Sequence, residues 1–467
     1  MTQLRDIRIL VLGLGETGRS LLRWLDREGA SIRAADSRDA PPSLEELREQ
    51  YPDVEFHCGA FNETLLDDIE LIALSPGISL NEPVLLEASM RDIPIVGDIE
   101  LLAWQLAEDQ RKQPIVIAIT GANGKTTVTS MVGAMCRAAG LDTAVAGNIS
   151  PAVLDVLAER DGEQPDVWVL ELSSFQLETT YTLNPDAATV LNISEDHLDR
   201  YDGMDEYIAA KARIFEGDGS QILNRDDAAS MGMALPGRAV VTFGLTLPTT
   251  ESDWGLWRHD GKTWLTQGRQ RVMNAAELRV AGLHNAANAL AALALCRAVD
   301  LPLEPLLDAL RAFRGLSHRV ERVAEIGGVS YYDDSKGTNV GATVAALTGL
   351  GCRCVLIAGG EGKGQDFSPL APVVAAHARA VVLIGRDADL IAAALGDSKV
   401  PLARAADMDA AVKTAAGLAQ AGDAVLLSPA CASFDMFRNY EHRAKVFVEA
   451  VRNLEEQWNK QGGEVTA

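Results

Sequence analysis

The stretch Ile115-Val-Ile-Ala-Ile-Thr120-Gly121-Ala-Asn-Gly-Lys-Thr-Thr127 decides how this sequence folds. Its apolar first half predicts a buried strand, and the residues from Val128 onward predict a helix. The glycine loop between them lets backbone N–H groups surround phosphate, with Lys125 bridging the β and γ positions and Thr126 able to bind Mg²⁺. The loop is of the shorter Gly-x-x-Gly-Lys-Thr type, because Ile119 stands where the longer motif has its first glycine. The flanking strand and helix favour ATP binding over a chance match.

Short apolar runs alternate with longer amphipathic stretches along nearly the whole chain, which predicts an α/β protein with mostly parallel sheets. A length of 467 residues favours roughly three domains of about 150 residues each. Two other strands, in the stretches Ile7 to Gly18 and Arg353 to Gly364, also run into glycine-rich turns. The polar stretch Gln110 to Pro114 and residues 314–317 are the expected linkers. The predicted domains are residues 1–108, 109–315 and 316–467.

The first glycine-rich turn carries Gly13, Gly15 and Gly18 in the pattern Gly-x-Gly-x-x-Gly, and Asp36 ends the next predicted strand. Glycines in this pattern let backbone N–H groups approach a diphosphate at a helix N-terminus. Taken alone, the pattern is typical of an NAD-binding turn. Two other interpretations stay open: a turn that only packs, and a turn that holds another diphosphate, such as that of a UDP-sugar.

Three side chains downstream of the phosphate loop are candidates for a site that binds metal. Glu171 ends the apolar run Val167 to Leu170, where a phosphate loop needs an acid, although an edge glutamate could also simply face water. His197 lies among acidic residues after another predicted strand and could be a metal ligand or part of a solvated loop. Lys211 lies on a predicted helix, and its spacing alone does not distinguish it from a surface lysine.

Three loops in the last third of the chain follow predicted strands and carry Lys336, Lys363 and Ser433. In an open parallel sheet such loops gather at the carboxyl edge, where ligands bind. The loops therefore indicate an anion site, and the alternative is three solvated loops that share a sheet edge.

The chain carries 42 Lys and Arg against 66 Asp and Glu, a formal net charge of −24. Such a surface repels nucleic-acid backbones and anionic lipid, so an anionic substrate needs a local cluster of cations. No apolar run is long enough to span a bilayer, and no small-residue cleavage site follows the first predicted strand. The six cysteines form no CxxC pair, which favours reduced thiols in a cytoplasmic protein.

Taken together and in this order, the motifs resemble those of the Mur ligases, which build the peptide stem of peptidoglycan. The resemblance implies an N-terminal Rossmann-like domain that binds UDP, a central P-loop ATPase domain and a C-terminal Rossmann-like domain that binds an amino acid. It covers nearly the whole chain. The stretches that carry it, beside the phosphate loop, are Glu171-Leu-Ser-Ser-Phe-Gln-Leu177, Asn192 to Tyr201, Gly282-Leu-His-Asn-Ala-Ala-Asn288, His318-Arg319, Asp334-Ser-Lys336 and Ser428-Pro-Ala-Cys-Ala-Ser433.

Two stretches, Gly13-Leu-Gly-x-Thr-Gly18 and Asp334-Ser-Lys-x-Thr-Asn339, are similar to the family members that join D-glutamate to UDP-N-acetylmuramoyl-L-alanine. Matching positions imply three sets of binding residues. Those for the UDP substrate are Gly15, Thr17, Ser37, Arg38, Ser75, Asn148 and His197. Those for ATP are Gly121, Ala122, Asn123, Gly124, Lys125, Thr126, Thr127, Asn285, Asn288, Arg319 and Asp334. Those for D-glutamate are Thr338, Lys363, Ser433 and Tyr440, the last through its backbone.

The resemblance also implies two Mg²⁺ ions, bound by Thr126, Glu171, His197 and a carbamate on Lys211. The expected catalytic residues are Lys125, His197, Lys211 and Lys336, with Lys336 near the transferred phosphate. We expect a cytoplasmic monomer that binds neither nucleic acid nor membrane and that forms an amide bond through an acyl phosphate. The rival interpretations are another Mur-type or folylpolyglutamate-type ligase and an NAD-dependent dehydrogenase, which would explain only the first domain.

Overall fold

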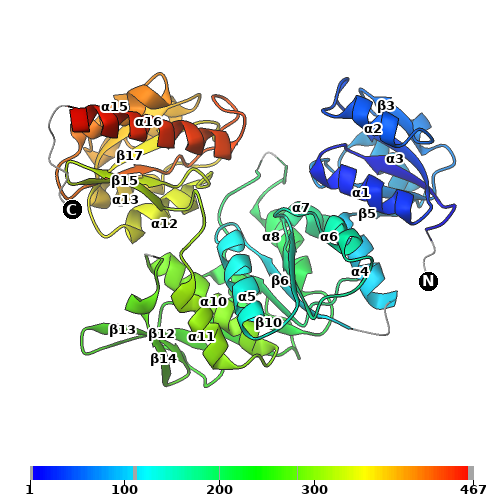
Figure 1. Ribbon diagram of the computed structural model, residues 1–467, viewed down its shortest axis with the longest axis horizontal. Helices are drawn as coiled ribbons and strands as arrows, with labels where there is room; N and C mark the ends of the chain where they lie inside the picture. The colour runs from blue at the N-terminus through cyan, green and yellow to red at the C-terminus, as the bar shows by residue number, and fades with distance from the viewer. Residues whose placement is uncertain (1–3, 109–112, 199, 281, 461–467) are drawn as a thin grey trace.

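The computed structural model describes residues 4–108, 113–198, 200–280 and 282–460, which form three lobes (Figure 1). Each lobe is built around its own sheet, and the first and third lobes lie on either side of the central one in this view. The prediction of an α/β chain with mostly parallel sheets is confirmed. The first predicted linker, from Gln110 to Pro114, lies partly outside the described residues, because positions 110–112 are not among them.

The first lobe contains a five-stranded parallel sheet in the order β3-β2-β1-β4-β5. The strand order reverses beside β1, so the glycine-rich turn after β1 opens at the edge where such sheets bind ligands. The strands are β1 (Arg8–Leu12), β2 (Ser31–Asp36), β3 (Glu55–Cys58), β4 (Leu71–Leu74) and β5 (Ile95–Val96). The helices are α1 (Glu16–Arg27), α2 (Leu44–Gln50), η1 (Glu63–Leu66) and α3 (Pro83–Met90).

Helix α4 (Asp98–Glu108) follows the first sheet but packs against α6 and α7 of the central lobe (Figure 1). The buried Glu100 carboxylate accepts hydrogen bonds from the backbone N–H groups of Tyr181 at 2.6 Å and Thr182 at 2.9 Å. The buried Asp98 accepts a hydrogen bond from the Gln176 amide at 3.3 Å. This helix therefore fastens the first lobe to the second.

The central lobe contains a nine-stranded sheet in the order β14-β13-β12-β11-β10-β9-β6-β8-β7, parallel except for the antiparallel ribbon β12-β13-β14. The phosphate loop follows β6, which lies between β9 and β8 where the strand order reverses. The strands are β6 (Ile115–Thr120), β7 (Thr143–Gly147), β8 (Val167–Glu171), β9 (Ala187–Val190), β10 (Ser220–Asn224), β11 (Val240–Phe243), β12 (Trp254–His259), β13 (Lys262–Gln267) and β14 (Gln270–Asn274). The helices are α5 (Lys125–Ala138), α6 (Val153–Glu159), α7 (Ser174–Glu178), α8 (Met204–Ala212), η2 (Arg213–Phe215), α9 (Ala228–Gly232), η3 (Ala275–Glu277), α10 (Leu283–Ala298) and α11 (Leu303–Ala312).

The third lobe contains a six-stranded sheet in the order β15-β16-β20-β17-β18-β19, antiparallel only between β15 and β16. The three loops predicted to form an anion site follow β16, β17 and β20, which are neighbours in this sheet. The strands are β15 (Glu321–Ile326), β16 (Val329–Asp333), β17 (Cys354–Gly359), β18 (Ala378–Ile384), β19 (Leu402–Arg404) and β20 (Ala424–Leu427). The helices are α12 (Val340–Gly349), α13 (Leu370–His377), α14 (Ala388–Ala394), η4 (Gly396–Ser398), α15 (Met408–Leu418) and α16 (Tyr440–Lys460).

Both faces of each sheet are covered by apolar side chains, and the central strands of the sheets are buried. All six cysteines are free, as the absence of a CxxC pair led us to expect. Among the helices of the described residues, none combines the length and the apolar character needed to cross a bilayer. The two predicted domain boundaries, after residues 108 and 315, stay predictions.

Candidate active site

The phosphate loop is held in shape by a residue that closely follows the neighbouring strand β9. The Asn192 side chain accepts a hydrogen bond from the Asn123 backbone N–H at 2.8 Å and donates one to the Asn123 carbonyl at 3.0 Å. Gly124 has a φ of +86°, and a Cβ there would lie 2.7 Å from Asn288 Oδ1, so glycine is required. Because Gly124 closes the turn, α5 begins at Lys125 rather than near Val128.

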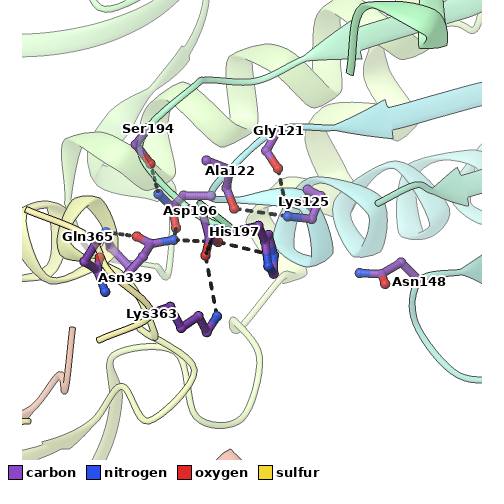
Figure 2. Close-up of polar contacts among 12 residues, drawn as sticks. Gly121, Ala122, Lys125, Asn148, Ser194, Asp196, His197, Asn339, Lys363 and Gln365 are labelled. Atoms are coloured by element: carbon purple, nitrogen blue, oxygen red, sulfur yellow. Dashed lines mark hydrogen bonds and ion pairs between the residues drawn. The ribbon is translucent and has the colours of Figure 1, made fainter. Parts of the chain in front are cut away.

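Lys125 folds back over the phosphate loop, as Figure 2 shows. Its ammonium donates hydrogen bonds to the carbonyls of Gly121 at 2.8 Å and Ala122 at 3.0 Å. Burial lowers the pKa of Lys125, and the neighbouring Glu171 and Asp196 act in the opposite direction. These backbone partners can be exchanged for phosphate oxygens without moving the helix, so the lysine is poised for an anion.

A cavity of about 310 Å³ lies between the phosphate loop and the third lobe. Arg319 enters it from the start of the third lobe and donates a hydrogen bond to the Thr126 hydroxyl at 2.8 Å. Burial raises the pKa of Asp334, on the far side, to about 7. The predicted ATP or phosphate residues that line this cavity are Asn123, Gly124, Thr127, Asn285, Asn288, Arg319, Asp334 and Lys336.

Glu171 ends β8 beside the phosphate loop and is nearly inaccessible to solvent. Its Oε1 accepts a hydrogen bond from the Asn148 side chain at 3.1 Å. Its Oε2 is buried and has no hydrogen-bond partner among the described residues. A buried carboxylate oxygen without a partner is costly unless a cation or water binds it, so this atom is a candidate metal ligand.

Lys211 is not a surface residue, because its side chain is 2% exposed at the end of α8. The Nζ atom donates hydrogen bonds to Gly121 O at 3.1 Å and to the Thr120 hydroxyl at 3.3 Å, and lies 4.8 Å from the centre of the Tyr207 ring. Burial, together with the positive charge of Lys125, holds the pKa of Lys211 well below its ordinary value. This environment therefore favours the neutral, nucleophilic form of the amine more than an exposed position would.

His197 follows β9 and packs edge-to-face on the Phe175 ring, with the ring centres 4.7 Å apart. Burial lowers the pKa of His197 to about 4, so the imidazole is neutral at neutral pH and has a lone pair for a metal or a proton. The adjacent Asp196 was not among the predicted site residues. Its Oδ1 lies 3.5 Å from Lys363 Nζ, which joins the central lobe to the third (Figure 2).

Five of the predicted UDP residues lie at the carboxyl edge of the first sheet, on the turns after β1, β2 and β4 and in the first turn of α1. Asp36 is fully engaged there, accepting hydrogen bonds from the Leu14 backbone N–H at 2.8 Å and from both arms of the Arg38 guanidinium. Burial alone would raise the pKa of Asp36, but these hydrogen bonds lower it. Across the gap to the central lobe, the Glu16 carboxylate accepts a hydrogen bond from Ser150 at 2.6 Å. The predicted residues at this edge are Gly15, Thr17, Ser37, Arg38 and Ser75, whereas Asn148, directly after β7, and His197 belong to the central lobe.

The predicted D-glutamate residues lie on neighbouring loops of the third lobe, but not all of them meet. Lys363 contacts Asp196, whereas the Tyr440 ring lies under Lys336, whose Nζ is 3.9 Å from the ring centre. Burial and then Arg319 lower the pKa of Lys336 to about 8. Within the described part of the chain, no hydrogen bond joins Lys363 to Thr338 or Ser433. The predicted backbone role of Tyr440 stays a prediction.

Arg443, which the sequence analysis did not single out, holds two of these loops together. Its buried guanidinium donates hydrogen bonds to the carbonyls of Ser335 at 2.8 Å and Cys431 at 3.1 Å, and to the Ser335 hydroxyl at 3.0 Å. It therefore fixes the loop of Lys336 and Thr338 relative to the loop of Ser433. Its sequence neighbours form an ordinary amphipathic helix, so no local pattern distinguishes it from a surface arginine.

Comparisons with known proteins agree over nearly the whole chain. Family models match residues 7–97 (Mur ligase MurD-like, N-terminal domain), 119–296 (Mur ligase middle domain) and 318–431 (Mur ligase, glutamate ligase domain). The chain is 58% identical to the UDP-N-acetylmuramoylalanine–D-glutamate ligase of Nitrosospira multiformis, over 96% of this chain and 95% of the relative. It is 57% identical to the ligase of the same name from Methylobacillus flagellatus, over 97% of this chain and 99% of the relative.

Solved structures with much lower identity share the fold. UDP-N-acetylmuramate–alanine ligase MurC from Thermotoga maritima is 19% identical, with a TM-score of 0.60 over 96% of this chain and 99% of that chain. MurF ligase from Thermotoga maritima, solved in complex with ADP, is 15% identical, with a TM-score of 0.61 over 99% of this chain and 100% of that chain. The three-lobed architecture is thus common to ligases of this type.

Proposed function

Because the chain belongs to the Mur ligase family, we propose that it forms the amide bond between D-glutamate and UDP-N-acetylmuramoyl-L-alanine, using ATP. It is a ligase of peptidoglycan precursor synthesis. The observation that carries the substrate assignment is the near full-length likeness to relatives named for this ligation. The cavity between phosphate loop and third lobe, lined by Asn123, Arg319 and Lys336, supports ATP as the nucleotide.

The reaction has two chemical steps. The alanyl carboxylate attacks the γ-phosphorus of ATP, which releases ADP and forms an acyl phosphate. The D-glutamate amine then attacks the acyl carbon, loses a proton and displaces phosphate, so that an amide remains. A carboxylate and a triphosphate repel each other, and we propose that Lys125, Arg319 and Lys336 offset this repulsion and stabilise the charge that develops on the transferred phosphoryl group.

The donor atoms beside the phosphate loop fit Mg²⁺, which prefers oxygen ligands. They are the partnerless Oε2 of Glu171, the Thr126 hydroxyl, the neutral His197 and, if it forms a carbamate, Lys211. When bound, Mg²⁺ would neutralise negative charge on the phosphate oxygens. We propose two ions, with Glu171 and Thr126 as candidate ligands of one, and His197 and a carbamate on Lys211 as candidate ligands of the other.

We propose that the turn after β1 holds the UDP diphosphate rather than NAD. In an NAD-binding turn the acid at the end of the second strand binds the ribose hydroxyls. Here the Asp36 carboxylate is engaged by Leu14 and Arg38, which leaves it poorly placed for a ribose. A dehydrogenase would also leave Lys125 and the third lobe without a role. We propose that Gly15, Thr17, Ser37, Arg38 and Ser75 contact the UDP group, and that Asn148 and His197 contact the muramoyl end.

The acceptor carries two carboxylates, and the chain around it carries a net charge of −24, so its site needs local cations. We propose Lys363 as the main one, with Thr338, Ser433 and Tyr440 binding the remaining oxygens. Lys363 has a φ of +51° between two glycines, which keeps its backbone N–H groups and its ammonium accessible to an anion. The ammonium now faces Asp196, and a substrate carboxylate would take the place of that acid.

We expect Lys363→Ala to raise the KM for D-glutamate about 10–100-fold, because a hydrogen bond to a charged group contributes about 1.5–3 kcal/mol. The KM for ATP should change less than about 3-fold, because Lys363 is outside the nucleotide cavity. Phosphate release at varied D-glutamate and varied ATP measures both. Lys413→Ala, on the exposed face of α15, is the matched control. A change in the KM for ATP alone would assign Lys363 to the nucleotide site instead.

A panel of acceptors tests the substrate assignment directly. With UDP-N-acetylmuramoyl-L-alanine and ATP present, we expect D-glutamate to stimulate phosphate release and D-alanine to fail, because D-alanine leaves the donors for the second carboxylate unpaired. L-lysine or meso-diaminopimelate as the best acceptor would make the protein a different Mur-type ligase. Folates as substrates would indicate a folylpolyglutamate-type ligase.

We propose that the reaction takes place in the cytoplasm and within a single chain. Six free cysteines fit a reducing compartment. The nucleotide cavity is lined by the phosphate loop and the third lobe of one chain, so a second subunit is not needed to complete it.

A further inference from the structure

Asn339 lies where the third lobe meets the central lobe, and its side chain is used on both sides (Figure 2). Its Oδ1 accepts a hydrogen bond from the Ala342 N–H at 2.9 Å and so caps the first turn of α12. This cap fixes the orientation of the amide, so the NH₂ group must point away from the helix. The NH₂ group donates to Asn123 Oδ1 at 3.1 Å and to Asp196 Oδ2 at 3.4 Å.

The two acceptors belong to the two halves of the reaction. Asn123 is part of the phosphate loop, whereas Asp196 faces Lys363, the proposed anchor of the acceptor. Asn339 is 3% exposed, so both hydrogen bonds are shielded from water. A buried donor that loses such acceptors stays unpaired, which makes the contact sensitive to the relative position of the two lobes.

The Lys363 loop is tied to the same end of α12. Gln365 Oε1 accepts a hydrogen bond from the Val340 N–H at 2.9 Å, and its amide donates to Gly362 O at 2.9 Å and Ala430 O at 2.8 Å. Hydrogen bonds of Gln365 therefore join the segments of Asn339 and Lys363 within the third lobe. These segments meet the central lobe through Asn339 and Lys363.

The helix end fits closely against the central lobe. A Cβ on Gly341 would lie 3.1 Å from Asn123 Nδ2 and 3.1 Å from Ser194 Oγ, closer than most side-chain contacts. The Asn123 amide is itself bonded to Ser194 at 3.3 Å. The phosphate loop, the loop after β9 and the start of α12 are thus in direct contact at one point.

We propose that Asn339 is a positioning residue that couples the phosphate loop to the Lys363 loop, so that ATP and the amino-acid acceptor bind cooperatively. The proposal rests on the proposed function for the identity of the acceptor. The Asn339 side chain is used by Ala342, Asn123 and Asp196, and the residue acts through the last two. The central lobe supplies the phosphate loop and the third lobe supplies the proposed acceptor site. Because the Asn339 side chain contacts both lobes, it favours simultaneous binding at the two sites.

The test uses two substitutions that keep the helix cap. Asn339→Ser retains a capping oxygen but cannot reach the central lobe, and Asn339→Asp retains the cap but puts a carboxylate beside Asp196. The Asp407 side chain caps α15 by accepting a hydrogen bond from the Ala410 N–H at 2.8 Å. Asp407→Ser changes this cap and is therefore the control for capping alone. Equal thermal midpoints in the three variants would show that the caps are intact.

In the wild type we expect the KM for D-glutamate to fall as ATP rises from subsaturating to saturating. In Asn339→Ser this dependence should disappear, with kcat/KM for D-glutamate reduced about 10–100-fold, as expected when hydrogen bonds that include a charged acceptor are lost. Asn339→Asp should be more impaired than Asn339→Ser, and Asp407→Ser should behave as wild type. A wild-type KM for D-glutamate that does not depend on ATP, or an Asn339→Ser variant with wild-type constants, overturns the proposal.

A second measurement needs no substrate. By amide hydrogen exchange, the loops of Asn123 and Asp196 should exchange faster in Asn339→Ser without ligands than in the wild type and Asp407→Ser, because both loops lose a hydrogen-bond donor while Arg319 and Lys363 still join the lobes. Equal exchange of these loops in all three proteins also overturns the proposal. If the wild type does not use D-glutamate at all, the proposed function fails, and the exchange comparison still decides whether Asn339 joins the lobes.

Discussion

We expect Lys125→Ala to lower phosphate release about 1000-fold or more, since removal of a group that stabilises transition-state charge costs several kcal/mol of activation free energy. The Nζ atom of Lys125 donates hydrogen bonds to two loop carbonyls, at 2.8 Å and 3.0 Å, which phosphate oxygens can replace. Initial rates of phosphate release at saturating substrates measure the effect.

The same substitution should leave the thermal midpoint within about 2 °C of wild type, because Lys125 is not part of an apolar core. Lys413→Ala, an exposed lysine of α15, serves as the control and should be fully active. More than about a tenth of the wild-type rate in Lys125→Ala would contradict the role of this loop in phosphoryl transfer.

Lys211 should carry a carbamate in the active enzyme, and Lys211→Ala should lose nearly all activity. An amine attacks CO₂ only in its neutral form, losing a proton as the N–C bond forms, and burial together with Lys125 favours that form here. The carbamate turns a buried cation into an anionic oxygen ligand of the kind that Mg²⁺ prefers. We expect a carbonyl signal in ¹³C NMR after equilibration with ¹³C-bicarbonate, and its absence in Lys211→Ala.

Removal of bicarbonate separates this role from a purely structural one. Exhaustive degassing should lower wild-type activity, and added bicarbonate should restore it. Unchanged activity after degassing, together with a working Lys211→Ala variant, would mean that the lysine only fills space beside Tyr207. Circular dichroism of the variant shows whether the fold has survived the loss of a buried side chain.

The strands and glycine turns could be predicted because each depends on a pattern of a few consecutive residues. The run Ile115 to Thr120 forms the predicted strand, although the helix after the phosphate loop begins at Lys125 rather than near Val128, and the three loops of the third lobe do follow adjacent strands. The roles of side chains that depend on burial could not be predicted as well from the sequence. The sequence could not distinguish Lys211 from a surface lysine, because its burial comes from β6 and the phosphate loop, 90 positions away.

The contacts between lobes were out of reach for a similar reason. Asp196 stood beside the predicted His197, yet only its approach to Lys363, 167 positions later in the chain, gives it a role. In the sequence, Asn339 is indistinguishable from an ordinary helix cap. Its hydrogen bond to Asn123 depends on the fold, which brings the phosphate loop to its NH₂ group. Such pairings depend on how whole sheets are arranged, which no local pattern records.

Helix α4 determines where the polypeptide can be cut. A shortened protein that begins at Ile115 would lack Glu100, leaving the backbone N–H groups of Tyr181 and Thr182 without their acceptor and uncovering apolar surface on α6 and α7. A shortened protein that begins just before Asp98 would keep Glu100 as the hydrogen-bond acceptor and α4 as the cover of α6 and α7. A chain expressed from just before Asp98 should therefore be a stable two-lobed protein, whereas one that lacks α4 should aggregate.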